Sequence, residues 1–166
     1  YKDRKVLEVQ TGGEFREFIK GGGYTHKLSK NIYDKGGIQP AFLATHIWSH
    51  SIIKYFDEES DLILDGSPRT YPEALVMDSV FKFYGIEKPN IIHIDISREE
   101  SIKRLLNRKR FDDNIDDIEA RLDFYYKDVI PVVDFYRNNE SYNFVELNGE
   151  RSVEDIHRDI IAKTIK

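Results

Sequence analysis

The sequence contains no cysteine among its 166 residues, and this absence removes several kinds of chemistry together. The chain has no disulfide, no thiolate nucleophile and no cysteine-ligated zinc site, which is compatible with a reducing cytosol. It contains no run of about 18 apolar residues, so we expect no membrane span. No basic segment precedes an apolar stretch, as it would in a signal peptide. The net charge of −5 argues against a surface that coats nucleic acid. We therefore expect a cytoplasmic protein without membrane or nucleic-acid partners.

The length and composition fit one soluble domain. Hydrophobic residues make up 40% of the chain and charged residues 33%, and 166 residues suffice for a substantial core. We find no internal repeat, low-complexity tract or linker, so residues 1–166 are expected to form a single domain. The first residue is Tyr1 rather than methionine, so the chain as given need not be a complete translation product.

Apolar runs alternate with helical patterns along the chain. The expected strands are residues 6–9, 62–64, 90–96 and 143–147. The expected helices are residues 11–19, 25–35, 40–56, 71–84, 97–106, 115–136 and 152–165. Capping boxes are expected at Thr11, Thr70 and Ser97, each followed by a glutamate three residues later, and Pro131 is expected to kink the sixth helix. This order predicts an α/β fold with a doubly wound parallel sheet and helices on both faces.

The segment DLILDGSPRT, residues 61–70, combines a strand with a polar turn. Its apolar run ends on Asp65, Gly66 and Pro68 then favour a turn, and Arg69 adds a guanidinium whose geometry suits phosphate oxygens. A helix is expected from Thr70 onward. The order of strand, acid, turn, arginine and helix is typical of a ligand crevice in an open α/β sheet. The residues alone leave open an ordinary loop with a surface ion pair.

Arginines are the most informative charged residues. Those of interest are Arg16, Arg69, Arg104, Arg108, Arg110 and Arg121, with Asp112 and Asp113 among the last four. Phosphoryl transfer needs several cations around the transferred group and Mg²⁺ near an acid, which this set could supply. The alternative is that the arginines on the later helices are surface residues paired with nearby acids.

Two further features carry weaker signals. His46 and His50 have the i, i+4 spacing that could place two imidazoles on one metal ion, but no third ligand accompanies them. Asp95 ends the strand NIIHIDI and could also lie at a sheet edge. We interpret Asp95 as structural and expect no metal at the histidines.

Four motifs together resemble the adenylate kinase family of nucleoside monophosphate kinases. DGSPRT at 65–70 resembles the family's D-G-F-P-R-T turn, and Thr11-Gly12 with Arg16 resembles T-G-D-x-x-R. GGIQP at 36–40 is similar to G-x-L-V-P. RLLNRKRFDDN at 104–114, followed by Arg121-Leu122, resembles the R-L-x-x-R…R-x-D-D-N…R-L signature of short-lid members. The motifs occur in the family's order and spacing, so the resemblance favours phosphate-binding arginines over surface ion pairs.

The resemblance implies reversible transfer of a phosphoryl group from Mg·ATP to a nucleoside monophosphate by a monomeric enzyme, with Mg²⁺ as its cofactor. Residues 11–56 would form the helical monophosphate-binding part and residues 107–114 the short lid. The residues that would hold the monophosphate are Thr11, Arg16, Gly37, Ile38, Gln39, Gly66, Arg69, Glu73, Arg110 and Arg121. Those that would face ATP are Arg104, Arg108 and Arg151, the last in a segment, 148–151, near the adenine.

The same resemblance implies a catalytic set. Its members would be Asp65, Arg69, Arg108, Arg110 and Arg121. Asp65 would act on the metal indirectly, by orienting water on Mg²⁺. Asp112 and Asp113 would fix the lid.

The largest departure from the family is the missing phosphate loop. The family begins with a strand and a G-x-P-G-x-G-K-[GS]-T segment, and the chain lacks both. Without the loop's amides and lysine the ATP phosphates lose their main support, so the chain as written is expected to be inactive or nearly so. We favour an omitted N-terminus. The alternative is a non-catalytic nucleotide-binding relative.

The other departures concern the acceptor base. Glu73 occupies the position of a glutamine that pairs with adenine, and an ionised glutamate cannot donate a hydrogen bond. It could accept from the adenine amino group or from guanine, or it could serve only the cap at Thr70. Ser67 replaces an aromatic residue, and Gly13 replaces an aspartate beside Glu14. AMP is the expected acceptor, with GMP or a pyrimidine monophosphate as alternatives.

Overall fold

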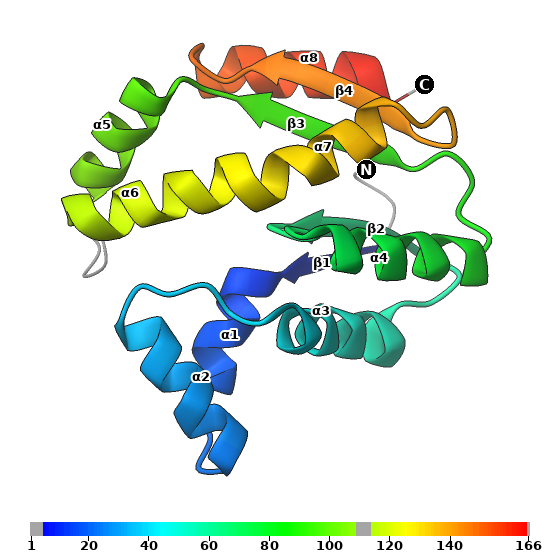
Figure 1. The fold of residues 1–166 in the computed structure, drawn as a ribbon. Helices are drawn as coiled ribbons and strands as arrows, with labels where there is room; N and C mark the ends of the chain where they lie inside the picture. Colours follow the sequence, from blue (N-terminus) through cyan, green and yellow to red (C-terminus); the bar gives the residue numbers. More distant parts are fainter. Residues whose placement is uncertain (1–4, 109–113, 166) are drawn as a thin grey trace. The chain divides into compact units, whose positions relative to one another are not determined.

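The computed structural model describes residues 5–108 and 114–165. The chain divides into two compact units, residues 1–76 and 77–166. Each unit is built around two parallel strands with helices between them in sequence (Figure 1). None of the helices in these two described ranges has the length and hydrophobicity needed to cross a bilayer.

The first unit contains the strands β1 (Lys5–Gln10) and β2 (Ser60–Asp65), which pair in parallel from Lys5↔Ser60 to Gln10↔Asp65. Helices α1 (Thr11–Phe18), α2 (Tyr24–Asp34) and α3 (Ala41–Tyr55) connect them. Helix α4 (Tyr71–Phe83) begins in this unit. The buried hydrophobic side chains of the first unit include Val9, Phe15, Leu43, Ala44, Ile47, Trp48 and Ile52. Helix α3 packs against α1 and β1, so the ends of β1 and β2 are held by one core.

The second unit repeats this plan. Strands β3 (Asn90–Asp95) and β4 (Asn143–Asn148) pair in parallel from Asn90↔Asn143 to Asp95↔Asn148. The chain between them forms α5 (Arg98–Arg108), α6 (Ile115–Phe124), the π-helix η1 (Tyr125–Val129) and α7 (Ile130–Arg137). Helix α8 (Val153–Thr164) packs against β4.

The prediction of an α/β fold with parallel strands is confirmed. The described strands form two two-stranded sheets, of order β1–β2 and β3–β4, rather than one sheet. Each pair is closed by its own helical connection, as parallel strands require. The predicted single domain, with its helical part at 11–56 and lid at 107–114, stays a prediction, and residues 109–113 lie outside the described residues.

The helix that starts at Ile115 changes its hydrogen-bonding pattern before Pro131, and the predicted kink at the proline stays a prediction. The helical axis is interrupted by the π-helix Tyr125–Val129, where the Ile130 N–H donates to the Tyr125 carbonyl five residues earlier. Pro131 has no N–H, and its ring would clash with the carbonyl four residues back in a regular α-helix. The wider π turn, which commonly appears as a single turn within an α-helix, provides the extra room.

The capping box predicted at Thr11 is absent. Gln10 is the N-cap of α1 and makes no side-chain cap. The Thr11 hydroxyl instead bonds the Ser67 hydroxyl at 2.7 Å, and the Glu14 carboxylate accepts from the Ser51 hydroxyl. Both side chains therefore make tertiary contacts, which the local T-x-x-E pattern could not reveal.

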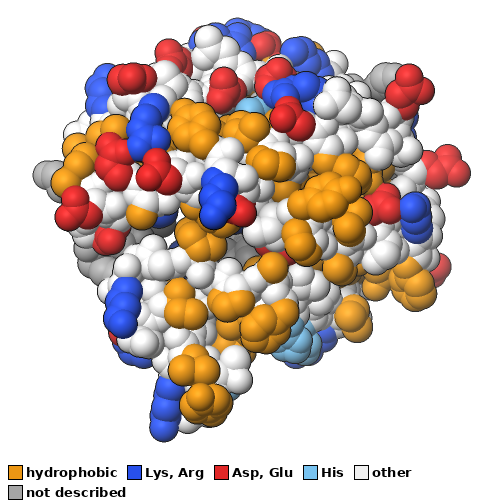
Figure 2. Space-filling model, in the orientation of Figure 1, with side chains coloured by type: hydrophobic (Ala, Val, Ile, Leu, Met, Phe, Trp, Pro, Cys, Tyr) orange, Lys and Arg blue, Asp and Glu red, His pale blue; other side chains and the backbone are white. Residues whose placement is uncertain are grey.

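Large hydrophobic side chains remain on the surface (Figure 2). They include Tyr24, Phe42, Ile53, Phe83 and Val153, each more than two-thirds exposed. The sequence-based expectation of a monomer supposed that helices would cover the apolar faces. That expectation stays a prediction.

One partly buried hydrogen bond in the second unit predicts a pH-dependent contribution to stability. The Tyr142 hydroxyl, almost fully buried, donates to Asp78 Oδ1 at 2.7 Å. Bonds from Lys82 and then Tyr142 lower the pKa of Asp78, while burial and then the Asp78 bond raise the pKa of Tyr142. Tyr142→Phe is expected to cost about 1.5–3 kcal/mol at neutral pH, as for hydrogen bonds to charged groups.

The pH dependence of this cost follows from the directions of the two pKa shifts. The lowered pKa of Asp78 contributes stability above its unfolded pKa, near 4, that is lost as the pH falls. The raised pKa of Tyr142 contributes stability that is lost as the pH rises above about 10. Urea unfolding of the unmodified protein and of Tyr142→Phe is measured from pH 3 to pH 11. The difference between their free energies of unfolding should be largest between about pH 4 and pH 10. If the difference in free energy of unfolding at pH 3 equalled that at neutral pH, the role assigned to the bond between Tyr142 and ionised Asp78 would be wrong.

Candidate functional site

The turn after β2 holds an arginine against the backbone. Asp65 is the last residue of β2, and Gly66 follows with φ +78°, a conformation that favours glycine. The Arg69 Nε donates to the Gly66 carbonyl at 2.7 Å. A Cβ at Gly66 would lie 2.8 Å from an Arg69 guanidinium nitrogen. The backbone angle favours glycine here, and a larger residue would also displace the Arg69 guanidinium from its present position. The predicted order of strand, acid, turn and arginine is confirmed.

The parallel register brings the start of α1 beside this turn. Gln10 pairs with Asp65, so the residues that follow both strands lie at one edge of the sheet. The buried Thr11 hydroxyl bonds Ser67 across this edge at 2.7 Å. A Cβ at Gly12 or Gly13 would lie 3.7 Å from the Arg16 guanidinium, so this group covers the first turn of α1. Two arginines thus border a helix N-terminus, an arrangement that favours anions.

The loop between α2 and α3 is fixed by its own hydrogen bonds. The Gly36 N–H donates to the Tyr33 carbonyl at 3.0 Å and the Gly37 N–H to the Ile32 carbonyl at 2.9 Å, a Schellman ending for α2. The Gln39 side chain accepts from the Ser29 hydroxyl and donates to the Ser29 carbonyl. Both the oxygen and the nitrogen of the Gln39 side-chain amide are bonded to Ser29. A ligand at this loop would therefore contact the backbone and the Ile38 side chain.

Glu73 is buried in the first turn of α4, with 2% of its surface exposed. Its Oε1 accepts from the Thr70 hydroxyl at 2.8 Å. Its Oε2 is buried and has no hydrogen-bond partner among the described residues. The predicted link between Thr70 and Glu73 is present as a side-chain bond. A buried carboxylate oxygen without a donor is costly, so the site is suited to a ligand that donates a hydrogen bond.

The second unit carries the other predicted arginines. The Arg104 Nε donates to Glu100 Oε1 at 2.7 Å, an i, i+4 pair on the surface of α5. Arg108 ends α5 and is exposed. The Arg121 Nε donates to the Asp117 carbonyl at 3.1 Å. Arg104 therefore makes the kind of surface ion pair that the alternative expected.

Arg151 lies in the loop after β4, held by contacts with Asp159 at 2.7 Å and the Asn148 carbonyl at 3.4 Å. The Gly149 N–H donates to the Asp95 carbonyl at 2.7 Å. A Cβ at Gly149 would lie 2.6 Å from the γ2 methyl groups of Ile94 and Ile96, so the loop closes directly onto the end of β3. Three predicted site residues, Arg110, Asp112 and Asp113, lie outside the described residues.

Sequence reasoning missed two networks that hold the second unit together. Arg98 pairs with Glu119 and, at 3.2 Å, with Asp123, which joins α5 to α6. The pKa of Arg98 is raised, mainly by the bond to Glu119. At the N-terminus of α5 the Ser97 hydroxyl accepts from the Glu100 N–H at 3.3 Å, whereas the Ser97 N–H donates to Glu150, so only half of the predicted capping box forms.

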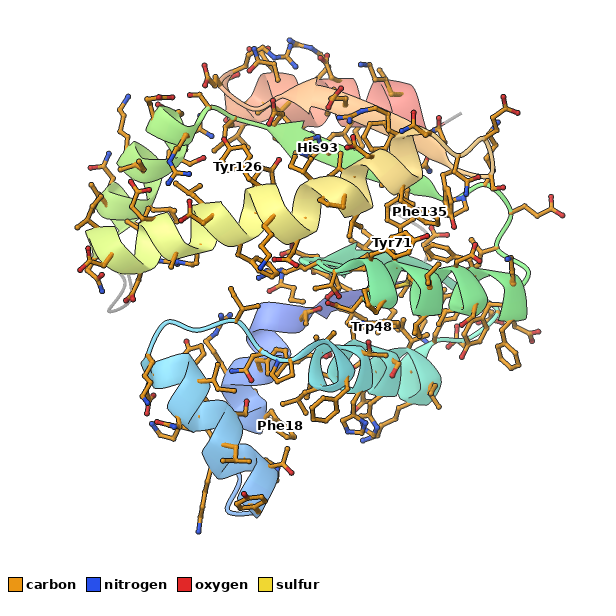
Figure 3. The ribbon with its side chains drawn as sticks, viewed as in Figure 1. Phe18, Trp48, Tyr71, His93, Tyr126 and Phe135 are labelled. Atoms are coloured by element: carbon orange, nitrogen blue, oxygen red, sulfur yellow. The ribbon has the colours of Figure 1, made fainter. Side chains whose placement is uncertain are left out.

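The second network connects the sheet to the π-helix. His93 (Figure 3) lies 2.8 Å from the Tyr125 hydroxyl through Nε2 and 3.1 Å from Glu146 through Nδ1. Arg137 donates to the same Glu146 at 2.5 Å and lowers its pKa. Burial, followed by the charge of Asp95, raises the pKa of Tyr125 to about 12. His93 and Glu146 are register partners, a fact that only the strand pairing supplies.

His46 and His50 lie one turn apart on α3. The rings of His46 and His50 lie 6.0 Å apart. Within the part of the chain that the structure describes, no group of three histidines or acids could hold an ion. Asp65 is an exposed, single carboxylate at a strand end. Its predicted role toward Mg²⁺ stays a prediction.

Comparisons with known proteins place this geometry in context. A family model described as adenylate kinase matches residues 1–141. The adenylate kinase of Phocaeicola vulgatus is 31% identical over 165 residues, 97% of this chain and 86% of its own length. The adenylate kinase of Corynebacterium diphtheriae is 29% identical over 153 residues, 92% and 82% respectively. That of Leptospira biflexa serovar Patoc is 30% identical over 160 residues, 94% and 84%.

Proposed function

Because the chain belongs to the adenylate kinase family, we propose that the protein transfers a phosphoryl group reversibly between Mg·ATP and a nucleoside monophosphate. AMP is the preferred acceptor in this proposal. The observation that carries it is the sheet edge of the first unit, where Arg16 and Arg69 border a helix N-terminus beside the Thr11–Ser67 contact. Such an edge suits a phosphate dianion.

The first unit acts as the acceptor half. Arg69 is oriented by its bond to the Gly66 carbonyl, which leaves its terminal nitrogens for a phosphate. Thr11 and Arg16 complete the phosphate contacts, and the backbone of the 37–39 loop borders the base. These residues bind and orient the monophosphate so that its oxygen attacks in line.

The second unit acts as the donor half. Arg104 and Arg108 on α5 face the ATP phosphates, and Arg151 lies near the adenine. Arg110 and Arg121 bridge the phosphates of both nucleotides, where positive charge stabilises the charge that spreads over the transferred group. Mg²⁺ carried with ATP would neutralise charge on the phosphate oxygens, and Asp65 would act on it indirectly by orienting a bound water.

Residues 1–166 contain no glycine-rich loop that ends in lysine and threonine. Such a loop surrounds the ATP phosphates with backbone amides, so we expect this chain alone to bind AMP with little or no turnover. The second candidate function, a non-catalytic nucleotide-binding protein, follows from the same observation. AMP binding without turnover in the longest natural form of the protein would favour it over the kinase.

The acceptor is tested by a coupled assay of the full-length natural protein with AMP, GMP, CMP and UMP. Glu73→Gln replaces the unpaired Oε2 with an amide donor, so an adenine ring nitrogen gains a partner. We expect the KM for AMP to fall about tenfold, as one additional hydrogen bond allows. The KM for GMP should rise, because guanine presents two donors to Glu73.

The matched control is Glu87→Gln, an exposed carboxylate of the second unit, which should leave both KM values unchanged. A Glu73→Gln variant with an unchanged ratio of AMP to GMP activity would show that Glu73 serves only the Thr70 cap. Faster turnover of GMP than AMP by the unmodified protein would contradict the proposed acceptor.

A further inference from the structure

We propose that the π-helix η1 sets the rotation of α6 about its own axis and so positions Arg121, with Tyr125 as a positioning residue. The inference rests on the proposed role of Arg121 at the phosphates of both nucleotides. Its evidence lies within the second unit, where α6, η1 and α7 follow one another without a break (Figure 1). π turns within α-helices occur frequently at functional sites.

The same residues could form a regular α-helix. Ile118 on α6 and Tyr136 on α7 are both buried, and about five turns of a regular α-helix separate them in the sequence. A regular helix would therefore place both side chains on one face. The π turn closes its hydrogen bond over one residue more, which rotates α6 by about 100° relative to α7. The two arrangements thus differ in the direction in which α6 presents its side chains.

Arg121 follows the rotation of α6. It lies one turn before η1, and its Nε donates to the Asp117 carbonyl of the same helix at 3.1 Å. A rotation of about 100° would carry the guanidinium several ångströms around the helix axis. Misplacement of a reacting group by about 1 Å can lower a rate about 100-fold. The step assigned to Arg121 is therefore sensitive to whether η1 is a π turn or an α turn.

A chain of hydrogen bonds from the sheet holds the π turn. The Tyr125 hydroxyl lies 2.8 Å from His93 Nε2, and His93 Nδ1 lies 3.1 Å from Glu146. Glu146 also accepts from Arg137 at 2.5 Å, and a carboxylate can only accept. A neutral His93 must therefore donate from Nδ1 and accept the Tyr125 hydroxyl proton at Nε2. The first residue of η1 is in this way bonded to β3, and through His93 to β4.

Two further features oppose a regular helix at this point. Arg98 on α5 pairs with Glu119 and Asp123 of α6, and its guanidinium lies 5.9 Å from the ring of Tyr126 (Figure 3). These contacts hold α6 and η1 in their present rotation. Pro131 has no N–H, and its ring would clash with the carbonyl four residues earlier in a regular helix.

The released variant combines Arg98→Met, Tyr125→Phe and Pro131→Ala in the full-length natural protein. Without these constraints η1 can form an α turn, which rotates α6. We expect kcat for ATP and AMP to fall at least tenfold while both KM values change less than threefold. The reason is that Arg121 acts on charge that develops in the transition state. An unchanged kcat in the released variant would overturn the proposal.

Deletion of Lys127 from the released variant is the decisive comparison. Lys127 is exposed within η1, and its removal takes out the additional residue, so a regular helix would then keep α6 in its present rotation. We expect kcat to return to within about threefold of the unmodified protein. A purely stabilising role would predict a further loss, because the deletion replaces none of the lost contacts. Failure to restore kcat in a variant that circular dichroism shows to be folded would overturn the proposal.

Tyr126→Phe is the matched control for the Tyr125 hydroxyl. Tyr126 is the next residue in the chain, is half-exposed and contributes its ring to the contact with Arg98. We expect Tyr125→Phe alone to lower kcat about threefold and Tyr126→Phe to leave it unchanged. Equal losses in the two variants would overturn the assignment of Tyr125.

The rotation is measured without catalysis on the 166-residue chain. The chain contains no cysteine, so Ala120→Cys on α6 and Glu154→Cys on α8, both exposed, take up spin labels selectively. We expect electron paramagnetic resonance to show a change of at least about 5 Å between the labels in the released variant. The deletion of Lys127 should reverse this change. An unchanged distance in the released variant would overturn the proposal.

This measurement separates the inference from the proposed function. A changed distance in the released variant, with no phosphoryl transfer by the unmodified full-length protein, would support the rotation of α6 and contradict the kinase. Transfer by the unmodified protein, with no effect of the released variant on distance or kcat, would support the kinase and overturn the role of η1.

Discussion

Replacing Arg69 with alanine is expected to lower kcat/KM for AMP at least 100-fold in the full-length natural protein. In the structure the Arg69 Nε is bonded to the Gly66 carbonyl, which orients the guanidinium at the edge where β1 and β2 end. A charge-assisted hydrogen bond to a phosphate becomes stronger in the transition state, and such a bond contributes about 3–4 kcal/mol in enzyme sites. A steady-state coupled assay with ATP and AMP measures the loss.

Two matched variants make this result specific. Arg69→Lys keeps the charge but not the forked geometry, and should recover only a small part of the activity. Arg158→Ala removes an arginine that pairs with Asp155 on the exposed surface of α8 and should change kcat/KM less than twofold. If Arg69→Ala kept most of the activity of the unmodified protein, the role assigned to the strand-end turn would be wrong.

Replacing Trp48 with alanine is expected to reduce the free energy of unfolding of the first unit by about 3–5 kcal/mol, the usual cost for a buried tryptophan. Trp48 is fully buried on α3, which packs against β1 (Figure 3). Loss of the indole would remove packing contacts from α3 and from β1, the strand that leads into Thr11. Urea unfolding followed by circular dichroism measures the loss, since the variant no longer has a tryptophan to report by fluorescence.

Trp48→Phe is the control for this prediction. The indole Nε1 is buried without a hydrogen-bond partner among the described residues. Phenylalanine removes that unpaired donor along with some volume, so we expect the loss to be less than about half of the alanine value. An equal loss in both variants would contradict the assignment of the indole N–H as an unpaired donor.

Features that depend on neighbouring residues could be predicted from the sequence. The apolar run before Asp65, the glycine of the turn and the helix after it form a local pattern, and β2, Gly66 and α4 lie where that pattern placed them. The i, i+4 pair of Arg104 with Glu100 is equally local. The position of Arg69 beside the turn follows from these elements, but its bond to the Gly66 carbonyl does not follow from the local pattern.

Features that join distant segments could not be predicted. Thr11 bonds Ser67 across 56 residues, and Arg98 pairs with Glu119 across 21. Glu14 looked like a capping residue because of its distance from Thr11, yet its partner is Ser51 on another helix. The π turn before Pro131 also escaped prediction, because a proline signals an interruption without fixing where the backbone adjusts.

The parallel pairing of each sheet has a consequence for the rate of folding. Lys5 lies opposite Ser60 and Asn90 opposite Asn143, so every ladder contact joins residues more than fifty positions apart. Contacts of this separation must close a long loop before they return any stability, and folding slows as their share increases. Helical signal should therefore appear before strand protection when refolding is followed by pulsed hydrogen exchange. In both units, the amides of the strands that carry the site would be the last to be protected.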